Sequence, residues 1–362
     1  MPAPAPVGEE ESLGLTPRRA ALRPLEQVRC VVDGFLDLGK GTAGTDRSVS
    51  DALYEEGARA SLESGNPPSE MMNFGFAPAH PRAAELLKDF VGPDAASPDA
   101  VHSFTTYLRL FEQASGRGTI PENGTVLEVG CGKGAGLALL GRIHPQFRFV
   151  GLDLSRANIQ CASFAQSPRG NCTWMVGSAL DLPFADNSVD AIINCESSHC
   201  YPDFARFVAE AERVLKPGGY FAIADLRWVE KCWSYRTFNP EAPLLHQMKA
   251  ALNASGLHTV AEWDITPNVV ESRELCTASE AEKLREQTPR TRFFNMNHRA
   301  LVGTHCFRLL KGGHMAYHNA LMCKPHVKTP RERLTALAEL HAAGLISQSV
   351  YEREQASIVC LI

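Results

Sequence analysis

The sequence predicts an α/β fold built on a parallel sheet. Between Thr125 and Asp225, short apolar runs typical of buried strands alternate with segments of helical periodicity, and this alternation is typical of parallel sheets with right-handed crossovers. The first apolar run passes directly into a glycine-rich turn at 130–136 that opens a helix. In chain order, we expect strands at 125–130, 147–153, 172–177, 188–194 and 219–225, with helices at 134–144, 155–167 and 203–215.

Further elements are expected on both sides of this core. Residues 100–116 carry apolar side chains near helical spacing, whereas 240–311 have a helical pattern with interruptions. Residues 314–324 predict a closing strand. The tail after Pro325 predicts two short amphipathic helices around a Gly-Leu-Ile turn. Two earlier helices are expected at 51–64 and 81–90.

The glycine-rich turn is the strongest candidate binding site. Gly130, Gly132 and Gly134 lack β-carbons, so a ligand can approach their backbone, and the helix that follows offers free N–H groups. Taken alone, the spacing also fits a dinucleotide fingerprint. Asp153 ends the second strand, where a carboxylate can hold both ribose hydroxyls of a nucleoside. The turn and Asp153 together predict a nucleoside cofactor.

The order of four blocks makes the expectation more specific. TVLEVGCGKGAG, FRFVGLD, GSALDLPFADNSVDAIIN and RVLKPGGYFAIAD follow one another in the order and spacing of S-adenosylmethionine (SAM) methyltransferases. Residues 125–225 therefore resemble the core of a class I methyltransferase. The resemblance implies a Rossmann-like, seven-stranded sheet with an N-terminal helical cap, and SAM as the cofactor.

A closer resemblance lies outside the core, in MMNFGFA, ESSHCYP, ADLR, DITPNVV and RALVGTHCFRLLKGGHMAYHNALMCK. Over residues 70–324 the chain is similar to the phthiotriol/phenolphthiotriol dimycocerosate methyltransferase branch of small-molecule and lipid O-methyltransferases. By this likeness, Met72, Phe74 and Phe76 form part of a lid over SAM, and residues 228–311 build the acceptor pocket. Packing of the N-terminal helices on the sheet is the alternative for those aromatic residues.

The resemblance also assigns cofactor contacts. Glu128 is expected to face the methionine amino group, and a carboxylate suits this cationic end of SAM; a solvated strand-end acid is the alternative. Leu154 is expected beside the adenine, although a core leucine fits as well. Ser178 stands where many relatives carry an aspartate that binds the adenine amino group, so Asp181 or a backbone N–H is the alternative partner. The expected cofactor-binding residues are Glu128, Gly130, Gly132, Gly134, Asp153, Leu154, Ser178, Ala179, Asn194 and Glu196.

His199 is the candidate catalytic base. It follows the fourth strand, and open α/β sheets bind ligands beyond the carboxyl ends of their strands. An alcohol or phenol loses a proton when it is methylated, and an imidazole that titrates near neutrality suits that step. Some sugar and natural-product O-methyltransferases carry a similar Glu-Ser-x-His loop with an aspartate after the fifth strand, which implies that Asp225 supports His199. The alternative is that His199 only shapes the loop and Asp225 merely ends a strand.

The scattered thiols and histidines carry less chemistry. Cys195 and Cys200 flank the candidate base, and we interpret both as packing residues rather than substrate-binding thiols. His298, His305, His314 and His318 have no acidic partner at ligand spacing, so no metal site is expected.

Composition limits the partners and the compartment. The net charge of −5, without a long basic run, argues against a nucleic acid partner. No apolar stretch approaches the roughly 18 residues that a membrane span needs. The N-terminus lacks a signal pattern, and eleven cysteines without CxxC pairs suggest reduced thiols in the cytoplasm.

The expected function is O-methylation of a hydroxyl on an apolar small molecule, lipid or polyketide, as in secondary metabolism. C-methylation is the alternative reaction, and a non-catalytic SAM-binding scaffold is the alternative of another class. Aromatic candidates for an apolar acceptor pocket are Trp228, Trp233, Phe238, Trp263, Phe293 and Phe294.

Four regions are expected along the chain. The first, 1–48, is rich in Pro, Ala and Gly and is expected to be disordered. A helical cap (49–116) and the methyltransferase domain (117–326) follow. The tail (327–362) weakly resembles a SHOCT-type hairpin through which the chain could self-associate.

Overall fold

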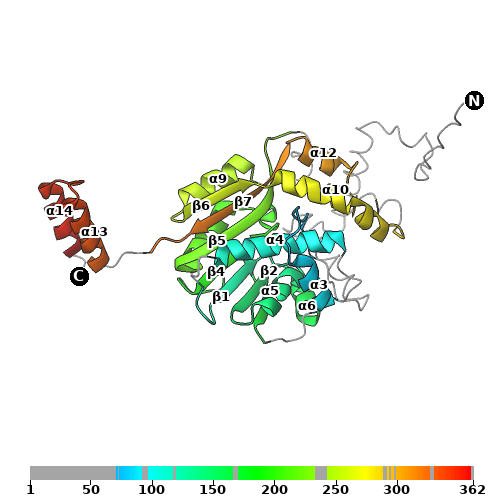
Figure 1. Ribbon diagram of the computed structural model, residues 1–362, viewed down its shortest axis with the longest axis horizontal. Coiled ribbons are helices and arrows are strands. Elements are labelled where there is room, and N and C mark those ends of the chain that lie inside the picture. Colours follow the sequence, from blue (N-terminus) through cyan, green and yellow to red (C-terminus); the bar gives the residue numbers. More distant parts are fainter. Residues whose placement is uncertain are drawn as a thin grey trace, which may run out of the picture.

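The protein is described by a computed structural model that centres on one mixed sheet (Figure 1). Its described residues are 71, 73–91, 97–116, 120–165, 170–232, 243–287, 292, 295, 296, 299–326 and 330–359. Seven strands of this part of the chain pair in the order β3-β2-β1-β4-β5-β7-β6. The strands are β1 (Thr125–Val129), β2 (Arg148–Asp153), β3 (Cys172–Val176), β4 (Val189–Cys195), β5 (Leu215–Trp228), β6 (His258–Asp264) and β7 (Met315–Cys323).

The pairing confirms the predicted α/β core. β1 is parallel to β2 and β4, β2 is parallel to β3, and β4 is parallel to β5. β7 inserts antiparallel between β5 and β6. The strand order reverses beside β1, and open α/β sheets bind ligands at the carboxyl ends of the strands that flank such a switch point.

The helical prediction for 240–311 is wrong over β6. This segment, His258–Asp264, is an edge strand whose side chains are exposed or half-buried, so it lacks the continuous apolar run that marks the inner strands. Its extended conformation depends on β7, which pairs with it from residue 315 onward. The strand prediction for 219–225 is correct but short, because β5 continues to Trp228 alongside β7.

Helices cover both faces of the sheet. α4 (Pro98–Ser115), α5 (Ala135–Ile143) and α6 (Arg156–Ala165) pack on the strands from one side, whereas α7 (Phe204–Val214) and α9 (Leu245–Ala254) pack from the other. Figure 1 shows α4 crossing the near face of the sheet. The remaining helices are α3 (Ala83–Val91), η3 (Ser198–Cys200), α10 (Thr266–Lys283), α12 (His305–Lys311), α13 (Pro330–Ala342) and α14 (Gln348–Val359).

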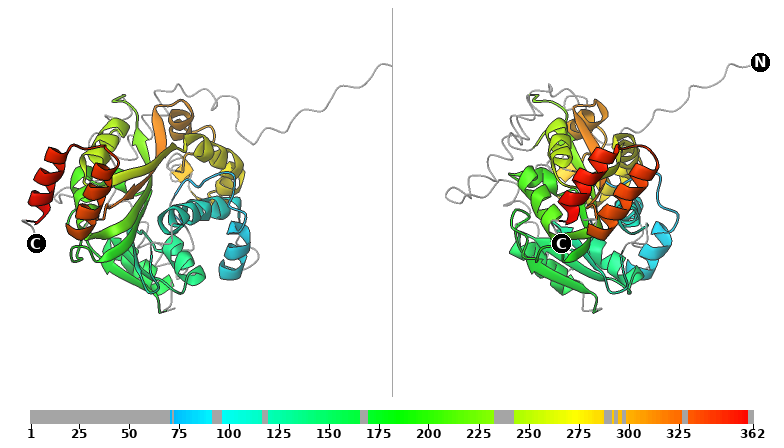
Figure 2. Two further views of the ribbon diagram at one scale, coloured as in Figure 1. Left: turned by 60° about the vertical axis from the view of Figure 1, so that its left-hand side comes forward. Right: turned by 90° about the vertical axis from the view of Figure 1, so that its left-hand side faces the viewer.

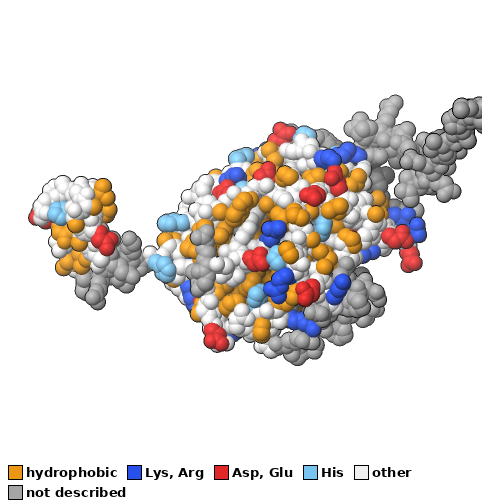
Figure 3. Space-filling model, viewed as in Figure 1, with side chains coloured by type: hydrophobic (Ala, Val, Ile, Leu, Met, Phe, Trp, Pro, Cys, Tyr) orange, Lys and Arg blue, Asp and Glu red, His pale blue; other side chains and the backbone are white. Residues whose placement is uncertain are grey.

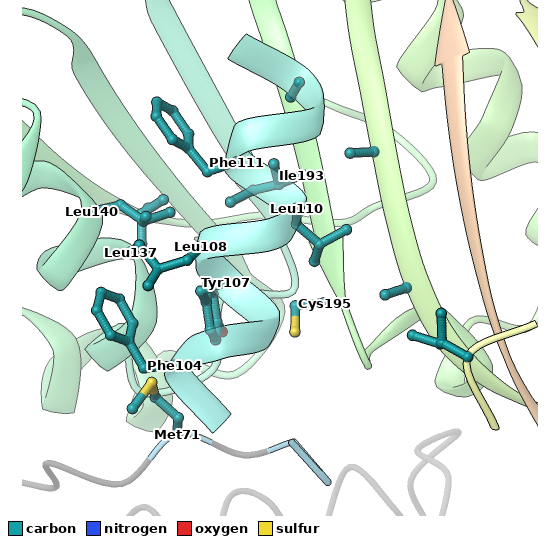
Figure 4. Packing of buried hydrophobic residues seen from close by; sticks show 14 of the residues in the cluster. Met71, Phe104, Tyr107, Leu108, Leu110, Phe111, Leu137, Leu140, Ile193 and Cys195 are labelled. Carbon is teal, nitrogen blue, oxygen red and sulfur yellow. The ribbon is translucent and has the colours of Figure 1, made fainter. Parts of the chain in front are cut away.

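The alternation of side chains along β1 decides which face each residue reaches. Val126 lies in the apolar cluster under α4, whereas Leu127 and Val129 lie in the cluster under α7. Glu128 therefore points to the α4 side, because side chains alternate with a period of two. Figure 4 shows the α4 residues of this cluster, among them Tyr107 and Phe111, packed over the sheet.

The tail forms the expected pair of helices. α13 packs on α14, and Leu337 and Ile358 are buried between them. The pair lies at one end of the molecule, outside the helix layers of the sheet (Figure 2). Residues 1–70 lie outside the described residues. No helix in the described ranges is long and apolar enough to cross a membrane.

Candidate active site

The glycine-rich turn joins β1 to α5 at the carboxyl edge of the sheet. Gly130 and Gly134 have φ of +73° and +77°, a region that side chains with a β-carbon rarely adopt. A β-carbon on Gly130 would lie 2.4 Å from Ser197 Oγ, and one on Gly134 would lie 2.7 Å from the Trp174 ring. Glycine is therefore required here by backbone conformation and by close packing.

Asp153 lies against this turn, as the sequence predicts. Its Oδ2 accepts a hydrogen bond from the Gly132 N–H at 2.8 Å, and its Oδ1 accepts from the Ser155 N–H at 2.9 Å and Asn158 Nδ2 at 3.1 Å. These contacts fix the carboxylate at the end of β2. A contact between Asp153 and a ribose stays a prediction.

Glu128 is a fully buried acid at the end of β1. Neither carboxylate oxygen has a hydrogen-bond partner of good geometry among the described residues. Burial raises the pKa of Glu128 to about 8, against a smaller opposing effect of the neighbouring Tyr107 hydroxyl. A buried carboxylate without a partner is costly, and a cationic ligand would relieve that cost. The charged amino group of SAM fits this position.

Apolar side chains at the ends of β2 and β3 also suit a nucleoside. Leu154 is 61% exposed and Val176 is 42% exposed. Leu154 is therefore not a core leucine, and it is available to pack against a flat ring.

Ser178 forms a tight turn with Asp181. The Ser178 hydroxyl accepts a hydrogen bond from the Leu180 N–H at 3.1 Å, and Ser178 bridges to Asp181 through the backbone. Asp181 is exposed, and Ala179 is half-buried against the core under α7. The adenine contact of this turn stays a prediction.

His199 and Asp225 form a hydrogen-bonded pair. His199 Nδ1 lies 2.8 Å from Asp225 Oδ1, and the His199 backbone N–H donates to Asp225 Oδ2 at 2.9 Å. The imidazole is 20% exposed, whereas Asp225 is fully buried. Burial opposes the charged imidazolium, but Cys200 and the Asp225 carboxylate outweigh it, so the pKa of His199 lies well above its ordinary value.

Arg227 and Ser198, which had no predicted role, both contact Asp225. Arg227 Nη1 lies 3.0 Å from Asp225 Oδ2, and Arg227 Nη2 donates to Ser198 Oγ at 2.7 Å. Ser198 Oγ in turn donates to Asp225 Oδ2 at 2.5 Å. Although burial opposes ionisation, Arg227 and His199 hold the pKa of Asp225 well below its usual range. The ADLR segment contains a signal for this, because Asp225 and Arg227 are two residues apart on one strand and so share a face.

Asn194 fixes the loop that carries His199. Its Nδ2 donates to the Val129 carbonyl at 2.9 Å and to Ser197 Oγ at 2.8 Å, and it lies 3.2 Å from the Tyr201 hydroxyl. These contacts tie the end of β4 to the end of β1. The structure therefore gives Asn194 Nδ2 partners within the chain, and the predicted contact of Asn194 with the cofactor stays a prediction.

The two cysteines beside this loop differ. Cys195 is buried, and burial raises its thiol pKa well above the ordinary value, as expected of a packing residue. Cys200 is only half-buried, beside His199. The interpretation as a packing residue therefore fits Cys195 better than Cys200.

Glu196 contacts the segment predicted as a lid. It adopts a left-handed conformation with φ of +47°. Its Oε2 accepts hydrogen bonds from the Phe74 N–H and from the Tyr317 hydroxyl, both at 2.8 Å. Phe74 is buried and Phe76 packs under Arg109 at 4.3 Å, whereas Met72 lies outside the described residues.

The expected acceptor residues are only partly described. Trp228 is buried in the apolar cluster under α4, whereas Trp263 is 41% exposed on the edge strand β6. Trp228 is thus a core residue. Trp233, Phe238, Phe293 and Phe294 lie outside the described residues, as does His298.

No group of metal-binding side chains was found in the described ranges. His314 Nδ1 lies 3.0 Å from Glu230, and His318 Nε2 lies 3.3 Å from Glu262. These histidines therefore do have acidic neighbours, contrary to the sequence-based expectation, but each is in a separate pair.

Comparison with known proteins identifies the family to which the chain belongs. Residues 127–223 match the family model described as a methyltransferase domain. The chain is 37% identical over 194 residues to the phthiotriol/phenolphthiotriol dimycocerosates methyltransferase of Mycobacterium tuberculosis. The matched residues cover 53% of this chain and 66% of that protein. It is 35% identical to a probable second enzyme of this name from Mycobacterium ulcerans, covering 53% of this chain and 67% of the relative. The chain belongs to the SAM-dependent methyltransferases.

One further relative and two solved structures are also similar to this chain. A fatty-acid O-methyltransferase of Mycolicibacterium smegmatis is 36% identical over 40% of this chain and 53% of its own length. Among solved structures, geranyl diphosphate C-methyltransferase of Streptomyces coelicolor matches 75% of this chain and 98% of its own, with a TM-score of 0.51 and 18% identity. A cyclopropane synthase of M. tuberculosis matches 62% and 85%, with a TM-score of 0.51 and 16% identity. At such identities these structures support the fold alone.

Proposed function

We propose that this methyltransferase methylates a hydroxyl oxygen of an apolar small molecule or lipid, with His199 as the general base. The observation that carries the proposal is the His199–Asp225 pair beside the glycine-rich turn and the buried Glu128 carboxylate. SAM, when bound, supplies an electrophilic methyl group at this edge of the sheet. The remaining chemistry is alignment of the acceptor and removal of its proton.

The cofactor is held by residues at the ends of β1 to β4. Glu128 binds its ammonium group, Asp153 its ribose and Leu154 the face of its adenine. The N–H groups of the turn and the start of α5 offer further donors. The other proposed contacts are Gly130, Gly132, Gly134, Ser178, Ala179, Asn194 and Glu196.

Proton removal falls to the ring of His199. Because Nδ1 bonds to Asp225, Nε2 is the nitrogen that takes the proton from the acceptor. The buried Asp225 keeps the ring oriented and stabilises the imidazolium that forms, and Arg227 keeps Asp225 ionised. The raised pKa of His199 favours the protonated ring near neutral pH, and a bound cation nearby would lower that pKa so that the ring can accept the proton.

The relatives favour a lipid-like acceptor. Two of those compared are named for phthiotriol-type lipids and a third for fatty acids, which supports an apolar acceptor and a place in lipid or secondary metabolism. Methylation at carbon is the alternative, because a histidine base can also take a proton from carbon. A product analysis that places the new methyl group on oxygen or on carbon decides between them.

A carboxylic acid acceptor is a second candidate. The raised pKa of His199 favours an imidazolium near neutral pH, which would attract an acceptor carboxylate. A carboxylate needs no base, so its methylation would persist below the pKa of His199. Methylation of a hydroxyl would instead fall as pH decreases through that pKa. Activity measured against pH with a fatty acid and a matched fatty alcohol separates the two.

Self-association through the C-terminal hairpin is a further part of the proposal. α13 and α14 bury few apolar residues between them, and Leu340, Leu345 and Val359 are 43%, 71% and 53% exposed. Figure 3 shows apolar side chains on the visible surface of this pair. A two-helix unit this small gains stability by covering such side chains.

Nine described cysteines are all free, which supports a reducing compartment such as the cytoplasm.

The test is transfer of labelled methyl groups from SAM to hydroxylated lipids and polyketides. Labelled product with wild type, and its loss in His199→Ala with SAM binding retained, is the expected result. A folded protein that binds SAM but labels no acceptor would favour the scaffold.

A further inference from the structure

Residues 73–80 form a strap along the carboxyl edge of the sheet. The Phe76 N–H donates to the His102 carbonyl of α4 at 3.0 Å, and the Ala77 N–H donates to the Asn268 carbonyl of α10 at 3.1 Å. Gly75, at φ +75°, fits against His102 because a β-carbon there would lie 2.9 Å from the His102 side chain. The strap is therefore attached to two helices that cover this end of the sheet.

The strap reaches the catalytic loop at one point. The Phe74 N–H donates to Glu196 Oε2 at 2.8 Å, and Glu196 is three residues before His199. The same oxygen accepts the Tyr317 hydroxyl from β7 at 2.8 Å. One carboxylate oxygen thus joins the strap, the loop and the sheet, although the three segments are far apart in sequence.

The conformation of Glu196 depends on this junction. Its left-handed φ of +47° is strained for a residue with a side chain. Its backbone N–H donates to the Ala224 carbonyl of β5 at 2.8 Å, so β5 holds the backbone while Tyr317 and Phe74 hold the side chain. Tyr317 is 1% exposed, so its hydroxyl has no ready access to water as an alternative partner.

We infer that Glu196 and Tyr317 form a latch that fastens the strap across the entrance to the cofactor site. Tyr317 is a positioning residue, whereas Glu196 is also one of the proposed cofactor contacts, and SAM enters and leaves when the Phe74–Glu196 hydrogen bond opens. This inference rests on the proposed SAM site. A gate differs from a direct ligand contact in its kinetics, because weakening a gate speeds entry and exit together.

Tyr317→Phe is the first test, because it removes one hydroxyl and keeps the ring. Stopped-flow binding of SAM should show association and dissociation rate constants that both rise about tenfold, the loss expected for one buried hydrogen bond. The dissociation constant should change less than about threefold. Tyr351→Phe on α14 is the matched control.

Amide hydrogen exchange tests the latch in protein without SAM. In Tyr317→Phe, amides of peptides covering 73–80 should exchange about tenfold faster, whereas peptides of β1 and β4 should not change. Unchanged exchange of the strap, or a rise in the dissociation rate constant alone, would overturn the latch. Absence of SAM binding by wild type would instead overturn the proposed function, and the exchange result would still judge the latch.

Discussion

Replacing Glu128 by glutamine should make the protein more stable and a poorer SAM binder. The carboxyl group is fully buried, its oxygens have no partner of good geometry among the described residues, and burial raises its pKa from 4.5 to about 8. An acid with a raised pKa favours the folded state most when it is protonated. Wild type therefore loses stability from this group as pH rises from about 4.5 to about 8.

The magnitude follows from the pKa shift. Each pKa unit corresponds to about 1.4 kcal/mol. Because Glu128 ionises readily only in the unfolded chain, its raised pKa lowers the free energy of unfolding by about 3 kcal/mol at pH 7 and by about 1 kcal/mol at pH 5. Glutamine has nearly the same shape and cannot ionise. Glu128→Gln should thus raise the free energy of unfolding by about 2 to 3 kcal/mol at pH 7.

Urea unfolding of both proteins from pH 5 to pH 8 measures this difference. The difference in free energy of unfolding should grow with pH, and calorimetry should show SAM affinity reduced tenfold to a hundredfold in the variant, because the ammonium group loses an ionic partner. A stability difference that is constant with pH would refute the raised pKa. Unchanged SAM affinity would refute the role of Glu128 in binding.

Four further predictions concern the base, the ribose contact and the tail. His199→Ala should lower kcat about a hundredfold while the dissociation constant of SAM stays within about threefold; near-normal turnover would exclude the base. Because the pKa of His199 lies above its ordinary 6.5, wild-type activity on a hydroxyl should still rise with pH above neutrality, and a profile that is flat from pH 6 to 9 would contradict this. Asp153→Ala should weaken SAM binding about tenfold, because the ribose loses a charge-assisted contact; unchanged affinity would remove the ribose assignment. Deleting 327–362 should leave SAM binding intact and lower the number of chains per particle, as measured by light scattering. An unfolded core would show instead that the tail is structural.

The core of the site could be predicted from the sequence because its signals are local. The glycine-rich turn follows a buried strand directly, and Asp153 ends the next strand, so their meeting at one edge follows from parallel topology. The loop of His199 and Asp225 on β5 meet for the same reason, since β4 and β5 are neighbours. The structure has His199 Nδ1 at 2.8 Å from Asp225 Oδ1, as this topology predicts.

Other parts of the site depend on contacts that no local pattern encodes. Tyr317 reaches Glu196 only because β7 inserts beside β5, and the strap reaches Glu196 from more than a hundred residues earlier in the chain. Tyr107 lies beside Glu128 only because α4 crosses the sheet. The edge strand β6 was missed because half-exposed strands lack a continuous apolar run. Arg227 alone had a local signal, its spacing of two from Asp225.

The most direct measurement for the central claim is the position of the new methyl group. Wild type and His199→Ala would be incubated with isotopically labelled SAM and a panel of lipid and polyketide alcohols, and the products resolved by mass spectrometry and NMR. The account predicts a methyl ether formed by wild type and about a hundredfold less of it from the variant. A methyl group on carbon, or equal yields from both proteins, would contradict it.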